Sequence, residues 1–222
     1  MSKTRLTAYF YLLLTSIIWG AAGPVIKFTL IDFSPLVFLT YRFFISAVVG
    51  LIILFFIPKQ FPKRSTAFGL LLARSFLGST VVLGLLFYGF NETTSLSGTL
   101  LGSMSPILMS IVGVLLLKEQ VSRLERLGLL IAFVGTLVSI VEPAFSAEHA
   151  VFVATLRGNV LVILSLLADV VAVFMTKLLL KKGLTPLFQS SFMFIVGFST
   201  ILPLTLYLTP WQTGIKTIVE AP

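Results

Sequence analysis

Several charged side chains lie within the long apolar segments of this chain, and two of them, Asp169 and Arg42, are placed where they could do chemistry. Asp169 is twelve residues from both Arg157 and Lys181, which places it near the middle of a bilayer if the segment is helical. A charge at that depth is costly and usually serves a function, here binding a cationic group or exchanging a coupling proton. Arg42, about 10 Å into its segment, could attract an anionic group. Structural ion pairs are the alternative, with Arg42 or Arg74 as the partner of Asp169.

The first apolar segment contains a helix breaker and a charge, in the stretch WGAAGPVIKF from Trp19 to Phe28. Pro24 cannot donate to the carbonyl of Gly20, so the helix is weakened there. At 100° per residue, Lys27 shares a face with Gly20, and Trp19 lies beside it. We predict that this face packs inward and that Trp19 and Lys27 contribute to a solute site. An interfacial lysine that extends its ammonium to the outer headgroups is an equally good interpretation of Lys27.

A third group of candidates interrupts the apolar segment 94–117. Its members are Ser103, Ser105 and Pro106. Pro106 leaves the carbonyl of Gly102 without its usual donor, so that this group must meet a hydroxyl, water or solute. We predict a cavity wall here, while close helix packing through small residues is the alternative.

Several other chemistries lack the residues that they require. The sequence has no cysteine, and its single histidine, His149, lies between two apolar segments. No segment holds paired carboxylates, and no Gly-rich phosphate loop is present. We therefore predict neither an enzyme nor an ATP-driven pump, and we expect no cofactor and no metal site.

The composition places these residues in a membrane. Of the 222 residues, 57% are hydrophobic and only 11% are charged, which is unusual for a water-soluble domain. A helix needs roughly 20 apolar residues to cross about 30 Å of hydrocarbon. We predict an all-α polytopic membrane protein with about seven transmembrane helices. The predicted spans are 7–30, 34–57, 67–90, 94–117, 124–142, 157–180 and 186–208. Ser34 before Pro35 and Thr185 before Pro186 predict two sharp helix starts.

The basic residues indicate topology. The net charge of +8 arises mainly from lysines and arginines between the spans, so it does not predict nucleic-acid binding. If the N-terminus is cytoplasmic, ten basic residues lie in the inside loops and three lie outside. This is a strong positive-inside bias. We predict a multi-pass plasma-membrane protein with a cytoplasmic N-terminus and an external tail over 209–222.

Two pairs of spans resemble each other. Lys27 follows Trp19 by eight residues, Lys177 follows Asp169 by eight, and a proline comes eight or nine residues later in each pair. Five helices separate the two copies, so the second copy crosses the membrane in the opposite sense. Inverted repeats of this kind place a solute site near the bilayer midplane in secondary transporters. Chance agreement of proline spacing is the alternative.

The first five spans also carry a family resemblance. The stretches WGAAGPVIKF, SPLVFLTYRFF and NETTSLSGTLLGSMSPILMSIVGVLLLKEQ, with Arg42 before Phe43, resemble the EamA-type domain of the drug/metabolite transporter superfamily. The resemblance implies a ten-helix carrier, of which three helices of the second repeat would lie outside this sequence. The implied domains are a five-helix repeat over 7–142, an external linker over 143–156 and the start of an inverted second repeat over 157–208.

These observations together predict a secondary transporter, either an exporter or an importer, that moves a small polar metabolite such as an amino acid by alternating access. The expected partners are a small-molecule substrate, the lipid bilayer, a coupling proton or ion, and a second copy of the chain in a homodimer. The alternative is a truncated or non-transporting membrane subunit that works only with a partner chain.

Overall fold

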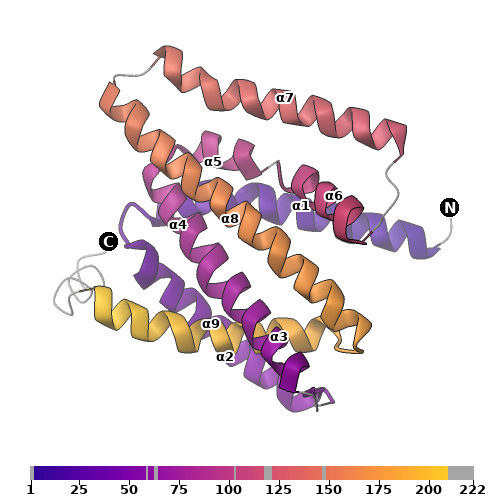
Figure 1. Ribbon diagram of the computed structural model, residues 1–222. Coiled ribbons are helices and arrows are strands. Elements are labelled where there is room, and N and C mark those ends of the chain that lie inside the picture. Colours follow the sequence, from indigo (N-terminus) through magenta and orange to yellow (C-terminus); the bar gives the residue numbers. More distant parts are fainter. Residues whose placement is uncertain are drawn as a thin grey trace.

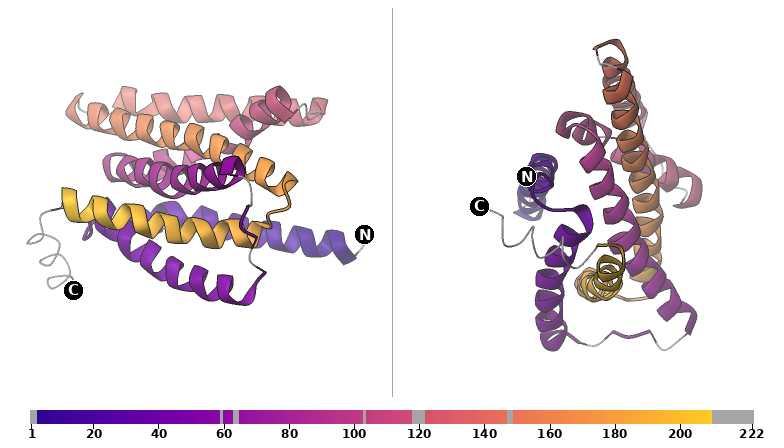
Figure 2. Two further views of the ribbon diagram at one scale, coloured as in Figure 1. Left: turned by 60° about the horizontal axis from the view of Figure 1, so that its bottom comes forward. Right: turned by 90° about the vertical axis from the view of Figure 1, so that its left-hand side faces the viewer.

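The computed structural model describes residues 3–58, 60–62, 65–102, 104–117, 122–146 and 149–209. Over these residues, every regular element is helical (Figures 1 and 2). The elements are α1 (Lys3–Thr29), α2 (Pro35–Phe56), α3 (Ser65–Phe76), the π-helical turn η1 (Leu77–Val81), α4 (Val82–Glu92), α5 (Ser95–Gly102), α6 (Ser105–Leu117), α7 (Arg123–Ser146), α8 (His149–Lys181) and α9 (Pro186–Leu208).

Six helical segments in the described part of the chain are long and apolar enough to cross a membrane. They are Tyr9–Thr29, Pro35–Phe56, Ser65–Glu92, Ser95–Val114, Thr155–Lys181 and Pro186–Leu208. The predicted all-α polytopic membrane fold is therefore confirmed. The fifth predicted span, 124–142, lies within α7, a helix of 24 residues that is not among these six.

The segment predicted as a linker, 143–156, is largely helical. Helix α7 continues to Ser146, and α8 begins at His149, eight residues before the start predicted at Arg157. Of the predicted tail, residues 210–222 lie outside the described residues.

Local sequence signals explain three of the helix starts. Ser34 and Thr185 are N-cap residues in extended backbone, each followed by a proline at the start of the helix, as predicted. The amide of Phe188 donates to Thr185 Oγ1 at 3.4 Å, whereas the side chain of Ser34 makes no capping hydrogen bond. Helix α7 begins with a reciprocal capping box, in which the amides of Ser122 and Glu125 each donate to the other residue's side chain.

Two long helix pairs form the core of the bundle. Helix α2 packs along α9, and α4 packs along α8, while α7 lies along the upper edge in Figure 1. The side chains buried between the pairs are mainly large and apolar. They include Leu39, Phe43, Phe87, Val162 and Ile201.

Contacts between loops show which helix ends lie on the same side. Gln60 Oε1 accepts hydrogen bonds from the Thr185 amide at 2.8 Å and from its hydroxyl at 3.0 Å, so the α2–α3 and α8–α9 connections meet. At the opposite end, the Thr93 hydroxyl donates to Asn159 Oδ1 at 2.6 Å.

Helices α4 and α8 approach each other closely at two glycines. A Cβ atom on Gly158 would lie 2.6 Å from the Thr93 nitrogen and 2.8 Å from the Gly89 oxygen. A Cβ atom on Gly89 would lie 2.7 Å from Cγ2 of Val162. Because two of these three contacts are with backbone atoms, side-chain rotation cannot relieve them. Small residues thus set this crossing, as is common between helices in lipid.

Gly158→Val should lower the free energy of unfolding by about 3 kcal/mol, at the upper end of the usual cost of overpacking. The backbone of α4 would have to move away from α8. Thermal unfolding in detergent micelles measures the effect. Gly69→Val is the matched control, since a Cβ atom on Gly69 meets nothing within 4 Å. Equal unfolding temperatures for the two variants would contradict this description of the crossing.

Candidate functional site

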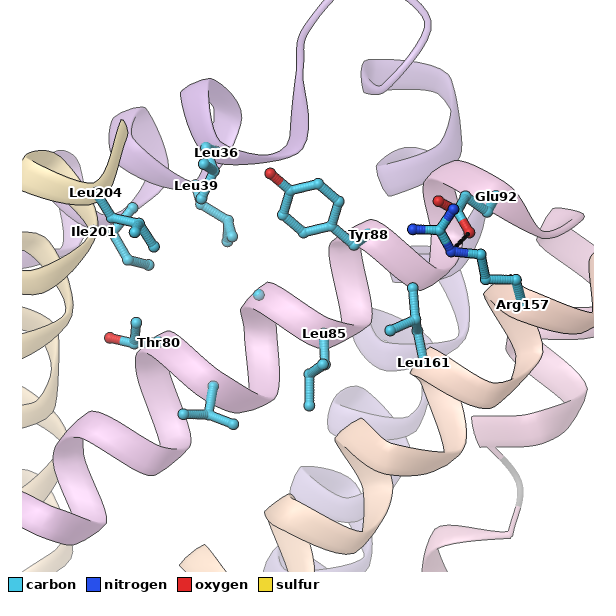
Figure 3. Close-up of a pocket in the computed structure, with 12 residues that line it drawn as sticks. Leu36, Leu39, Thr80, Leu85, Tyr88, Glu92, Arg157, Leu161, Ile201 and Leu204 are labelled. Atoms are coloured by element: carbon cyan, nitrogen blue, oxygen red, sulfur yellow. Dashed lines mark ion pairs between the residues drawn. The ribbon is translucent and has the colours of Figure 1, made fainter. Parts of the chain in front are cut away.

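A cavity of about 370 Å³ lies between α2, η1, α4, α8 and α9 (Figure 3). Its walls are mainly leucine side chains, and four of its lining residues carry polar groups: Thr80, Tyr88, Glu92 and Arg157. Small-molecule sites typically have volumes of roughly 300–1,000 Å³ with a few placed polar groups on apolar walls. The cavity therefore suits a small solute that has both an apolar and a polar part.

Most of the polar wall comes from one face of a continuous helical run. Thr80, Gly84, Tyr88 and Glu92 follow one another at intervals of four residues, which places them on one helix face. The Tyr88 hydroxyl points away from Glu92 and toward Leu36 (Figure 3). Since Gly84 has no side chain, the middle of this wall is left open.

An ion pair lies at one end of the cavity. Nε of Arg157 is 3.2 Å from Oε2 of Glu92 (Figure 3). The side chains of Arg157 and Glu92 are 76% and 24% exposed, so the surroundings screen the pair and it adds little to stability. The Arg157 side chain is therefore accessible to an approaching solute, whereas Oε2 of Glu92 is buried.

A contact between two hydroxyl groups lies at the other end of the cavity. Oγ1 of Thr80 lies 2.5 Å from Oγ1 of Thr200 on α9. Thr80 belongs to η1, where the Val82 amide donates to the carbonyl of Leu77 instead of the carbonyl four residues back. Such π-helical turns are uncommon and occur frequently at functional sites.

Beyond this contact, toward the end of the bundle that carries Gln60, apolar side chains fill the space. Leu71, Leu179, Leu184 and Phe188 form one buried cluster. The ring of Phe61 packs edge-on against Phe188, with 5.3 Å between the ring centroids. Among the described residues, this cluster seals the end of the bundle opposite Glu92 and Arg157.

Asp169 does not line this cavity. It is half-buried on α8 and interacts electrostatically with Arg74 of α3. Nε of Arg74 donates to Thr176 Oγ1 at 2.9 Å, while its Nη1 is buried without a hydrogen-bond partner. Of the two arginines considered from the sequence, Arg74 is thus the one that interacts with Asp169.

Lys27 is bound to the end of a neighbouring helix. Its Nζ donates to the carbonyl oxygens of Phe90 at 2.9 Å and Asn91 at 3.1 Å. These carbonyls belong to the last turn of α4, where a cation is stabilised by unpaired carbonyls and the helix dipole. Lys27 therefore attaches α1 to α4 and does not line the cavity.

The face of α1 that packs against the bundle begins later than predicted. Trp19 is 63% exposed, and Gly20 is exposed as well, so the prediction that they pack inward is wrong for the described bundle. Gly23 is the first residue of that face to be buried, and a Cβ atom there would collide with Thr99 Oγ1. The helical period predicts which face of α1 is buried. It does not predict which part of the length of α1 the neighbouring helices cover.

Arg42 packs on an aromatic ring. Its guanidinium carbon lies 5.7 Å from the centroid of Phe87 on α4, a cation–π geometry. The contact joins α2 to α4 outside the cavity wall described above.

The segment 94–117, predicted as one span, consists of two helices that meet beside Pro106. Helix α5 ends at Gly102 and α6 begins at Ser105, as expected where Pro106 cannot donate to the preceding turn. Ser105 is half-buried and Pro106 is exposed, whereas Ser103 lies outside the described residues. Neither Ser105 nor Pro106 lines the cavity.

A second hollow, of about 490 Å³, lies between α6 and α7. Its lining is apolar except for Ser110 and Arg126. A solute with several polar groups would find few partners there, so the cavity beside α4 is the better candidate site.

Comparison with known proteins identifies the family. Residues 6–141 match the EamA-like transporter family. The chain belongs to this family. No solved structure matches the chain.

The similarity to named relatives extends beyond the family domain. The chain is 32% identical to the uncharacterized transporter YetK of Bacillus subtilis over 98% of its own length and 66% of the relative's. It is 26% identical to the uncharacterized transporter YyaM of the same organism, over 91% of the chain and 66% of the relative. An uncharacterized transporter of Archaeoglobus fulgidus is 35% identical over 59% of the chain and 39% of that relative. The chain thus spans about two thirds of the length of the two Bacillus proteins.

Proposed function

We propose that the chain forms the solute site of a secondary transporter, an exporter or importer of a small polar metabolite such as an amino acid. The observation that supports this is a cavity of about 370 Å³ with a charged pair, Glu92 and Arg157, at one end and the Thr80–Thr200 contact at the other. A carrier that works by alternating access exposes its site to one side at a time. In our proposal the cavity represents one such state, open at the Glu92–Arg157 end and closed at the Thr80–Thr200 end.

The chemistry of the cavity suggests the kind of solute. The leucine-rich walls accept an apolar part, and the hydroxyls of Thr80 and Tyr88 offer hydrogen bonds to a polar part. At the mouth, Glu92 attracts an ammonium group and Arg157 attracts a carboxylate. A zwitterion with a modest apolar side chain meets each of these requirements.

The proposal includes the inverted repeat, with the first copy over 7–142 and the second beginning at 157. Helices α2 and α9 are then equivalent, and they pack against each other. Helix α8 is the equivalent of α1, and it packs against α4. The cavity thus lies where the two copies meet, the usual place for a solute site in inverted-repeat carriers.

The orientation is part of the same proposal. The basic residues are concentrated at the end of the bundle that holds Gln60 and Thr185, among them Lys181 and Lys182. By the positive-inside rule this end faces the cytoplasm. The cavity would then open to the outside of the plasma membrane, and the N-terminus would be cytoplasmic.

We assign a coupling role to Asp169. Its charge lies opposite Arg74 between α8 and α3. A proton or cation that neutralised Asp169 would leave the half-buried Arg74 without its counter-charge, and an uncompensated charge within the membrane is costly. An ion gradient could in this way change the stability of the α3–α8 contact.

Asp169→Asn should lower gradient-driven accumulation of the solute by about tenfold, or about 1.4 kcal/mol, while exchange of solute across the membrane without a gradient continues. The measurement uses the full chain in proteoliposomes, a panel of labelled amino acids and an imposed proton or sodium gradient. Asp32→Asn, the same change in the exposed α1–α2 turn, should leave both activities unchanged. Unaltered accumulation by Asp169→Asn would refute the coupling role, and no saturable uptake by the unmodified chain would refute the proposed function.

A further inference from the structure

Buried polar atoms without partners lie between α3 and α9, on the sealed side of the Thr80–Thr200 contact. Ser75 is 0% exposed and Gln189 is 1% exposed. The hydroxyl of Ser75 and Oε1 of Gln189 have no hydrogen-bond partner. The Gln189 amide nitrogen donates to the carbonyl of Leu184, so only one end of that side chain is satisfied.

The register of the two helices places these atoms along one seam. A Cβ atom on Gly78 would lie 3.4 Å from Sδ of Met193, and one on Gly197 would lie 2.8 Å from Cβ of Ser79. Thr80 and Thr200 meet one step further along. The segment 78–80 and the segment 193–200 of α9 therefore lie side by side, and their chains run in the same direction. Ser75, one turn before Ser79, and Gln189, one turn before Met193, continue the seam toward the sealed end.

Unpartnered polar atoms are unfavourable in this position. Leaving a buried donor or acceptor unsatisfied costs about 1–3 kcal/mol, and the hydrocarbon region offers no water to replace the missing partner. Apolar side chains would seal the seam at lower cost. A conformation in which water reaches the seam would remove the penalty, which gives these residues a reason to be polar.

We propose that the seam between α3, η1 and α9 is the second half of the solute path, closed in this conformation. This inference rests on the proposed transport function, to which it adds residues of the solute path that lie outside the cavity. Ser75 and Gln189 would bind water, and then the hydrogen-bonding groups of a small polar solute, after the Thr80–Thr200 contact opens. The aromatic contact of Phe61 with Phe188 closes the far end of this path.

The absence of cysteine from the sequence makes the test direct. Single variants Ser75→Cys and Gln189→Cys are treated, in membranes of known sidedness, with a charged methanethiosulfonate that does not cross lipid. Lys182→Cys marks the side of the sealed end, and Asp32→Cys marks the other side; both positions are exposed. Ser165→Cys is the matched buried control, because Ser165 is 1% exposed and its hydroxyl donates to the Val82 carbonyl at 2.9 Å.

Both seam cysteines should react from the side that modifies Lys182→Cys, at least about tenfold faster than Ser165→Cys, since modification follows thiol access. Reaction no faster than that of the control, or reaction from the Asp32 side alone, would overturn the proposal. Gln189→Cys keeps the test valid if Ser75→Cys does not fold. Labelling does not depend on transport: uptake without seam labelling would refute this inference alone, and labelling without uptake of any solute would refute the transport function.

Discussion

Replacing Gly84 by leucine should lower solute uptake strongly and leave the fold intact. Gly84 lies in the middle of the cavity wall, and a Cβ atom there would meet nothing within 4 Å. The leucine side chain would therefore extend into the open cavity without displacing a neighbour. It would occupy space that the solute requires, and we expect the initial rate of uptake to fall by at least about tenfold, equivalent to a loss of about 1.4 kcal/mol.

A second glycine of the same membrane-spanning run provides the control. A Cβ atom on Gly69 would also meet nothing within 4 Å, but Gly69 is exposed and does not line the cavity. Gly69→Leu should therefore transport at the unmodified rate. Thermal unfolding of both variants checks that folding is preserved. Normal uptake by a correctly folded Gly84→Leu protein would show that the solute does not pass through this cavity.

The helices themselves could be predicted from the sequence because one physical requirement dominates them. A segment in lipid must satisfy its backbone hydrogen bonds internally, so apolar length alone places most spans to within a few residues. Pro35 and Pro186 sharpen this further, since both begin helices where expected. Pro106 was expected to disturb the helix at Gly102, but the span was predicted as one helix and consists of two.

The candidate site was much harder to predict, because it depends on which helices are neighbours. Lys27 was recognised as unusual, yet its binding to the carbonyls of Phe90 and Asn91 requires knowing that α1 lies beside the end of α4. Trp19 has the correct helical phase and still lies outside the bundle. Asp169 and Arg74 were considered as a pair, but nothing in their spacing distinguished Arg74 from Arg42.

One signal for the cavity was present in the sequence. Thr80, Gly84, Tyr88 and Glu92 recur every four residues in an otherwise apolar span. A face that ends in a carboxylate and contains a tyrosine is harder to explain by helix packing alone, since packing favours small residues.

The contact between η1 and α9 offers the most direct test of alternating access. Oγ1 of Thr80 and Oγ1 of Thr200 are 2.5 Å apart, so cysteines at these two positions should form a disulfide on mild oxidation, and no other cysteine is present to compete. In the proposed cycle this contact must open once per transported molecule. A covalent bond across it would hold the cavity in its present state.

The decisive measurement is therefore uptake by a Thr80→Cys/Thr200→Cys protein in proteoliposomes, before oxidation, after oxidation and after reduction. The two single-cysteine proteins, treated identically, show any effect of oxidation without a crosslink. We predict that uptake is lost in the crosslinked protein and returns on reduction. Undiminished uptake by protein shown to be fully crosslinked would contradict the account, because the solute would then cross the membrane without the seam ever opening.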